Sequence, residues 1–208
     1  MKKKIVSLFL ALSLAFSLSV PALAATPEEA QDDAELLYNL GLFLGSSTNP
    51  DGTPNFALDR APTRAEAVTI LVRLLGAEDE ALAGTWNTPF TDVPTWAQPY
   101  VGYAYNKGYT NGVSSTTFGS SNAVSTAQFL TFLLRSLGYQ DGVDFTWEAP
   151  WALTDQLGVT NGEYNASTTF LRADAVTVSA SALYAPVKNS DKTLLQTLLD
   201  SGAITGST

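Results

Sequence analysis

The sequence has 208 residues, with 11 basic and 20 acidic side chains, and it contains neither His nor Cys. Without these residue types the common Ser-His-Asp triads, thiol nucleophiles and Cys/His zinc sites are excluded. The net charge of −9 disfavours nucleic acid and anionic membrane surfaces as general partners, so an anionic ligand would need a local cationic spot.

The first 24 residues have the pattern of a secretory signal peptide. A basic stretch, Lys2-Lys3-Lys4, precedes an apolar stretch from Ile5 to Val20, and Ala22-Leu23-Ala24 has the small residues that signal peptidase recognises. The alternative is a retained membrane anchor, for which the apolar stretch is short. We expect cleavage after Ala24 and an exported protein without membrane contact. Cleavage removes three lysines and no acid, which leaves a net charge of about −12.

The mature chain begins with a predicted helix. Thr26 is the cap, Pro27 takes the first helical position, and an apolar face follows at Leu36, Leu37, Leu40 and Phe43. The polar residues 46–55 then predict a turn. A calcium loop is excluded there, because Pro54 and Arg60 occupy the positions of its required Gly and closing Glu.

Residues 63–76 predict one complete helix. Thr63 is a good N-cap, Glu66 can close a capping box, and Gly76 supplies the C-terminal stop. Arg64 places a cation in the first turn, where the helix dipole and free N–H groups prefer an anion. Taken alone, this side chain is either solvated, with its stem covering apolar surface, or a ligand-binding cation.

The succession of helix, Gly-x-x-x-Gly turn, loop and capped helix recurs twice more. The glycine pairs are Gly41/Gly45, Gly108/Gly112 and Gly158/Gly162, and the equivalent first-turn residues are Arg64, Thr126 and Arg172. This self-similarity, at a period of about 55 to 65 residues, indicates three copies of one helical unit. We expect repeats at 25–84, 85–141 and 142–190. A C-terminal helix and tail at 191–208 would cap the bundle or contact a partner.

The second copy is the most informative. It contains Phe90-Thr91-Asp92-Val93, Trp96-Ala97, Lys107-Gly108-Tyr109 and Leu134-Arg135-Ser136-Leu137-Gly138-Tyr139, and the first copy contains Thr63-Arg64-Ala65-Glu66. In these residues the chain resembles the S-layer homology (SLH) family in its tandem triplet. The resemblance implies an all-α fold, a pseudo-threefold bundle of helix–loop–helix repeats with grooves between neighbouring prongs. It also implies a secreted protein held non-covalently at the cell wall by a secondary cell-wall polysaccharide, often through pyruvylated sugars.

The resemblance further implies that the signature Arg meets a ligand carboxylate and that the turn glycines let a sugar approach the backbone. The expected ligand-binding residues are Arg64, Arg172, Gly45, Gly112, Gly162, Glu66, Asp92 and Trp96. A guanidinium matches a carboxylate in bidentate geometry, and helix N-terminal N–H groups also favour an anion. Trp96 or Trp151 would stack on a sugar face, although core packing is the favoured role for both.

The copies depart from the family pattern. The second has Thr126 in place of Arg, the third starts its helix at the poor capping residue Leu171, and the first lacks a Phe-x-Asp-Val opening. We therefore expect at most two grooves, those centred on Arg64 and Arg172, to bind ligand. No carboxylate pair or phosphate loop stands out, so we expect no enzyme, cofactor or metal. The alternative is an exported structural or interaction module whose arginines make intramolecular ion pairs, with self-association or another surface protein as its partnership.

Overall fold

The structure is a computed structural model that describes residues 24–204, so the predicted signal peptide lies outside the described residues except for Ala24. The described helices are α1 (Gln31–Asn39), α2 (Arg64–Leu74), α3 (Glu78–Ala83), the 3-10 helix η1 (Thr95–Ala97), α4 (Gln98–Asn106), α5 (Thr126–Ser136), α6 (Trp151–Gln156), α7 (Arg172–Ala182) and α8 (Leu194–Ser201). The strands β1 (Ser47–Thr48) and β2 (Pro54–Asn55) form a short antiparallel hairpin. The all-α fold class is confirmed.

Three helices of eleven residues each, α2, α5 and α7, form the centre of the bundle. α2 and α5 begin with the predicted capping boxes, of Thr63 with Glu66 and of Ser125 with Gln128. The N-cap residue of α7 is Leu171, whose side chain has no hydrogen-bonding group. There the Asp174 carboxylate accepts a hydrogen bond from the Leu171 N–H at 2.6 Å, and so satisfies one of the orphan donors of the helix.

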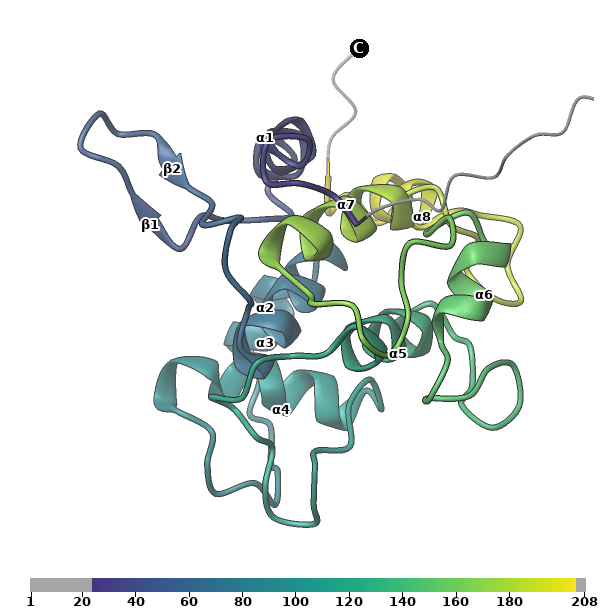
Figure 1. Ribbon diagram of the computed structural model, residues 1–208. Helices are drawn as coiled ribbons and strands as arrows, with labels where there is room; N and C mark the ends of the chain where they lie inside the picture. Colours follow the sequence, from purple (N-terminus) through teal and green to yellow (C-terminus); the bar gives the residue numbers. More distant parts are fainter. Residues whose placement is uncertain (1–23, 205–208) are drawn as a thin grey trace, which may run out of the picture.

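The outer helices close these three into a ring (Figure 1). α4 packs on α2, α6 packs on α5, and α1, the N-terminal helix, packs on α7 near the other end of the chain. α4 and α6 therefore each contact the central helix that precedes them in the chain. α1, the first helix, contacts the last central helix, α7, and so closes the ring. The repeat boundaries proposed from the sequence stay a prediction.

The N-termini of the central helices follow the same cyclic order. In α2, the Arg64 N–H donates to the carbonyl oxygen of Asn122 at 2.9 Å, and in α7 the Arg172 N–H donates to that of Arg60 at 2.9 Å. In α5 the Thr126 hydroxyl donates to the carbonyl oxygen of Thr168 at 3.2 Å. Each acceptor lies three residues before the N-cap of the next central helix in the ring. Each N-terminus is thus docked on the loop that leads into another central helix.

Two segments differ from the sequence-based expectation. The acidic connector after Gly76 contains a short helix, α3, because its three acidic residues occupy the first turn and favour the positive end of the helix dipole. The polar residues 46–55, predicted as a turn, form the whole β1–β2 hairpin, whose strands are too short for period-two alternation to reveal.

The last helix packs against the bundle. Leu194 and Leu198 of α8 are buried, and the Leu195 N–H donates to the carbonyl oxygen of Leu183 at 2.7 Å. The chain after α8 also approaches the end of α2, where a Cβ on Gly76 would lie 2.5 Å from that of Ala203. This helix therefore covers the bundle, as the capping interpretation expects. Among residues 24–204, the structure contains no helix with the length and apolarity needed to cross a membrane.

Candidate functional site

Arg172 lies in a hollow of about 350 Å³, which we call the Arg172 groove. Its walls come from the chain before β1, one face of α2, the η1–α4 region and the first turn of α7. The lining residues are Leu44, Gly45, Ser46, Glu66, Thr69, Ile70, Arg73, Trp96, Tyr100 and Arg172. The structure therefore brings together four of the eight predicted site residues in this groove.

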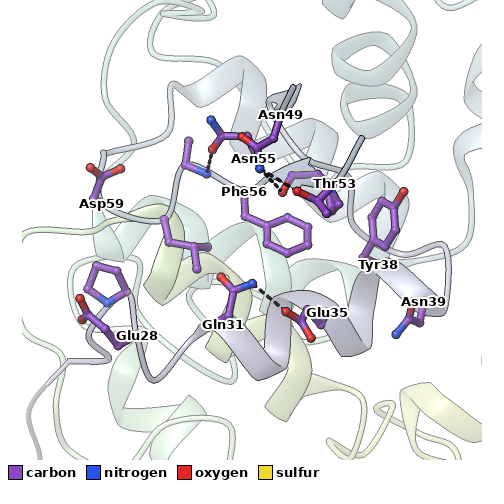
Figure 2. A pocket seen from close by; sticks show the side chains of 14 residues that line it. Glu28, Gln31, Glu35, Tyr38, Asn39, Asn49, Thr53, Asn55, Phe56 and Asp59 are labelled. Atoms are coloured by element: carbon purple, nitrogen blue, oxygen red, sulfur yellow. Dashed lines mark hydrogen bonds between the residues drawn. The ribbon is translucent and has the colours of Figure 1, made fainter. Parts of the chain in front are cut away.

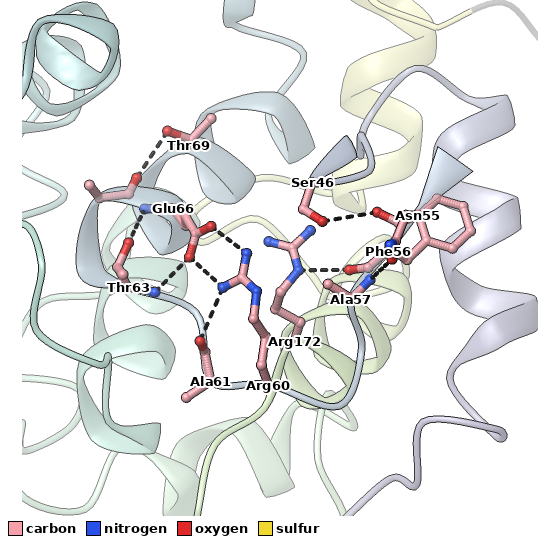
Figure 3. Close-up of polar contacts among 11 residues, drawn as sticks. Ser46, Asn55, Phe56, Ala57, Arg60, Ala61, Thr63, Glu66, Thr69 and Arg172 are labelled. Carbon is pink, nitrogen blue, oxygen red and sulfur yellow. Dashed lines mark hydrogen bonds and ion pairs between the residues drawn. The ribbon is translucent and has the colours of Figure 1, made fainter. Parts of the chain in front are cut away.

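The Arg172 side chain is only 3% exposed, and its guanidinium is held from one side. Its Nε donates to the carbonyl oxygen of Phe56 at 2.7 Å, and its Cζ lies 5.2 Å from the centre of the Phe43 ring. In Figure 3 the two Nη atoms point toward Ser46, away from the Phe56 carbonyl. Within residues 24–204 this guanidinium takes part in none of the ion pairs.

The charge on Arg172 is destabilised by its surroundings. Burial lowers the pKa of Arg172 to about 10, and although Glu66 opposes this shift, the positive charges of Arg60 and Arg73 add to it. A group with this pKa is still protonated at neutral pH. The free protein therefore holds a buried cation that an anion entering the groove would stabilise.

Glu66 lies at the edge of the groove but is already bound. Arg60 donates to both of its carboxylate oxygens, at 2.9 Å from Nη1 and 2.6 Å from Nη2, and the Thr63 N–H donates to it at 2.8 Å (Figure 3). Burial would raise the pKa of Glu66, but these hydrogen bonds and the charge of Arg60 outweigh it and lower the pKa to about 2. The geometry assigns Glu66 to the capping box and to Arg60.

Two aromatic residues, Trp96 and Tyr100, also line the groove. The Trp96 indole is 53% exposed, so the core-packing role favoured for it from the sequence is wrong. Tyr100 is fixed by its hydroxyl, which donates to Glu78 at 2.5 Å, and Arg73 donates to the same carboxylate at 2.9 Å. Trp96 is the middle residue of the 3-10 helix η1, whose next residue, Ala97, is buried.

Arg64 occupies the equivalent position in α2 but has different surroundings. Its Nε donates to the carbonyl oxygen of Phe118 at 2.9 Å, and its Cζ lies 4.8 Å from the Phe118 ring and 5.2 Å from the Phe132 ring. The side chain is 3% exposed, so the solvated interpretation of Arg64 is wrong. Burial lowers the pKa of Arg64 to about 10, with Asp92 opposing the shift.

Asp92 lies with Arg64 and away from the Arg172 groove. Its carboxylate accepts hydrogen bonds from three successive backbone N–H groups, those of Phe118, Gly119 and Ser120, at 2.7, 2.7 and 3.0 Å. Burial acts to raise the pKa of Asp92, and these three bonds lower it below its ordinary value. Asp92 therefore fixes the loop whose carbonyl holds Arg64.

The three glycines at the end of each turn have different surroundings. A Cβ on Gly45 would lie 2.8 Å from the carbonyl oxygen of Asn55, across the base of the hairpin, and one on Gly112 would overlap the ring of Phe90. Gly162 has a φ of +82° and no heavy atom within 4 Å of such a Cβ. Gly45 lines the Arg172 groove, and at Gly45 and Gly112 the missing Cβ makes room for this chain's own atoms.

The first N–H groups of α2 and α7, which the sequence suggested as donors to an anion, already have partners within the chain. The Arg64 and Ala65 N–H groups of α2, and the corresponding two of α7, donate to backbone carbonyl oxygens of the neighbouring loops. These donors are consumed by the ring contacts of the bundle. The arginine Nη atoms are the donors that remain.

Arg60, Arg73 and Tyr100 were missed as contributors to the site. A signal for Arg73 was present, because Glu66, Ile70 and Arg73 follow at spacings of four and three and so share one face of α2. Arg60, which binds Glu66, and Tyr100, which lines the groove, carry no such local signal, since both lie outside α2.

Comparisons with known proteins agree on one family. Residues 89–130 match the family model described as "S-layer homology domain". A "Cell surface protein" of Thermoanaerobacter kivui is 34% identical over 145 residues, which are 67% of this chain and 19% of that protein. A "Surface layer protein" of Brevibacillus choshinensis is 33% identical over 155 residues, 70% of this chain and 13% of that protein. The chain spans less than a fifth of the length of either relative.

Proposed function

Because the chain carries an S-layer homology domain, we propose that it attaches to the cell surface by binding an anionic cell-wall polysaccharide in the Arg172 groove. The observation that supports this most directly is the buried Arg172 guanidinium, which faces a 350 Å³ hollow and forms no ion pair within the described residues. Its pKa, lowered to about 10 by burial, leaves the side chain charged at neutral pH.

The chemistry of the groove suits an acidic sugar. The free Nη donors can bind a carboxylate, such as that of a pyruvylated unit, with charge-assisted hydrogen bonds. The half-exposed Trp96 residue, which also lines the groove, offers an apolar surface to the sugar ring. In a chain with a net charge of −9, this groove is the local cationic spot that an anionic partner requires.

The three central helices differ in what they offer such a ligand. Arg64 has the same cation but lies between two phenyl rings, and Thr126 has no charge at all. We therefore assign the main binding role to Arg172, a secondary role to Arg64 and none to Thr126. The role is one of attachment, without a catalytic step.

The test is co-sedimentation of the purified protein with cell walls that retain or lack their acidic polymer. The variants are Arg172→Met, which keeps side-chain length and removes the charge, and Thr126→Val as the control at the equivalent position of α5. We expect the wild type and Thr126→Val to sediment only with the acidic walls. Arg172→Met should bind about tenfold or more weakly, since a hydrogen bond to a charged group contributes about 1.5–3 kcal/mol.

Equal sedimentation with both kinds of wall, or wild-type binding by Arg172→Met, would overturn the proposal. Thermal unfolding of each variant tests whether a loss of binding comes from a loss of the folded state. Arg172→Met leaves the Phe56 carbonyl oxygen without its hydrogen bond, so the free energy of unfolding should fall by about 1–3 kcal/mol while the variant stays folded at the assay temperature.

A further inference from the structure

A second and larger hollow adjoins the segment that anchors Arg172. It has a volume of about 930 Å³ and lies between α1, the β1–β2 hairpin and residues 56–59. Figure 2 shows α1 side chains along one wall and hairpin side chains along the opposite wall, with the ring of Phe56 between them. We call this hollow the α1–hairpin pocket. The carbonyl oxygen of Phe56 holds Arg172, while its ring forms part of this second site.

The charge of the α1–hairpin pocket is opposite to that of the Arg172 groove. Three carboxylates, those of Glu28, Glu35 and Asp59, are among its lining residues, and none of its lining residues is Lys or Arg. An acidic sugar would be repelled there. Within residues 24–204 the structure holds no cluster of His, Cys, Asp or Glu suited to a metal ion. The occupant that fits is an uncharged or cationic molecule.

Two amide side chains that line the pocket each form one hydrogen bond and keep a hydrogen-bonding group unused. Gln31 donates from Nε2 to Glu35 at 2.8 Å, and the Asn55 Oδ1 accepts the Ala57 N–H at 3.0 Å. Within the described part of the chain, the Gln31 Oε1 accepts no protein hydrogen bond and the Asn55 Nδ2 donates none. One acceptor and one donor group are therefore available to ligand hydroxyl or acetamido groups.

The pocket also offers an aromatic surface beside these polar groups. Tyr38, on α1, is 41% exposed, and its ring centre lies 5.9 Å from that of Phe56 at an interplanar angle of 65°. A sugar ring has apolar C–H faces and a rim of hydroxyl groups, and so requires both kinds of contact at once. We propose that the α1–hairpin pocket binds an uncharged saccharide, a function separate from attachment through the Arg172 groove.

The hairpin limits this site to one place in the ring. Ten residues lie between Gly45 and Phe56, whereas five lie between the equivalent Gly112 and Phe118. The extra residues form the wall that carries Asn49, Thr53 and Asn55. The second copy has no room for such a wall, so we expect one neutral-sugar site in the protein.

The test is a titration followed by backbone amide NMR shifts, with maltotriose and triacetylchitotriose as neutral probes and trigalacturonic acid as the acidic probe. The neutral probes should shift amides in residues 31–39 and 53–59, and the acidic probe should bind there about tenfold more weakly. Tyr38→Ala and Gln31→Ala should each weaken neutral binding by about tenfold, because each removes one main contact. Leu36→Ala is the control, since Leu36 is 42% exposed on α1 but does not line the pocket.

The proposal is overturned if neither neutral probe shifts these amides, if the acidic probe binds the pocket equally well, or if Tyr38→Ala and Gln31→Ala both bind like the wild type. Its failure is distinguishable from failure of the proposed function. Neutral-sugar binding is scored in the α1–hairpin pocket by NMR, and attachment is scored by sedimentation with acidic walls, which Tyr38→Ala should leave unchanged.

Discussion

Arg172 and Arg64 occupy the same position of two equivalent helices, and both donate from Nε to the carbonyl oxygen of a phenylalanine, Phe56 and Phe118 respectively. Both side chains are 3% exposed, and burial lowers both pKa values to about 10. The two arginines are thus anchored in the same way. They differ in what lies on the other side of the guanidinium.

Around Arg64, two phenyl rings enclose the charge, and Asp92 holds the loop that supplies one of them. Around Arg172, one ring packs against the charge and the remaining side opens on the groove. The comparison shows that the arginine at this helix position links neighbouring parts of the ring, through the hydrogen bond from its Nε to a phenylalanine carbonyl oxygen. We expect it to serve as a ligand site only where it also lines a hollow, as Arg172 does.

The largest expected effect comes from removing the enclosure of Arg64. Phe118→Ala deletes a fully buried ring and should lower the free energy of unfolding by about 3–5 kcal/mol. Chemical denaturation measures this loss. If Arg64 is mainly structural, binding to acidic walls by the folded fraction should not fall, and a parallel loss of binding would show that Arg64 is an equal ligand site.

A smaller effect is expected from the loop that Asp92 fixes. Asp92→Ala removes an acceptor of three backbone N–H bonds and should lower the free energy of unfolding by about 2–3 kcal/mol, with faster amide hydrogen exchange at 118–120. Asp92→Asn keeps one oxygen acceptor and should cost less. The Arg172 groove should keep its binding in both variants, and a loss there would mean that the two sites are coupled.

The regular parts of the molecule were predictable from the sequence because they depend on local patterns. The capped helices at Thr63 and Ser125 follow from residues three positions apart, and both are present as predicted. The resemblance to the S-layer homology family agrees with the comparisons, in which residues 89–130 match the model of that domain. These conclusions rest on residue types that recur along the chain.

The site was less predictable because it is assembled across the ring. No spacing in the sequence indicates that Phe56 meets Arg172, 116 residues later, or that Arg60 binds Glu66 from outside the helix. The exposure of Trp96 was not predictable, because an aromatic residue at helical spacing is typical of a core. Whether the predicted residues bind a ligand stays a prediction.

Acid sensitivity offers a further distinction between the central helices. The pKa of Glu66 is lowered to about 2, so its contribution to stability is fully present above the ordinary value of 4.5 and is lost as the pH falls toward 2. Glu66→Gln keeps a capping side chain, as Gln128 does in α5, but loses the ion pair with Arg60. It should cost about 1–2 kcal/mol at pH 7 and flatten the dependence of unfolding on pH in this window. The control is Gln128→Glu, which should gain no comparable pH dependence, because none of the described ion pairs involves this position.

The smallest expected change in stability is at the turn glycines. Of these, Gly45 lines the Arg172 groove and Gly162 does not. Gly162→Ala should cost about 1 kcal/mol, because its φ of +82° strains a side chain, yet its surroundings are open. Gly45→Ala should cost a similar amount for another reason, since its Cβ would press on the Asn55 and Ser47 carbonyl oxygens at 2.8 and 3.0 Å. These close contacts should displace the base of the β1–β2 hairpin, which lies next to the Arg172 groove. Only Gly45→Ala should therefore weaken binding to acidic walls in the sedimentation assay. Equal binding by both variants would mean that ligand contact does not depend on the position of the hairpin.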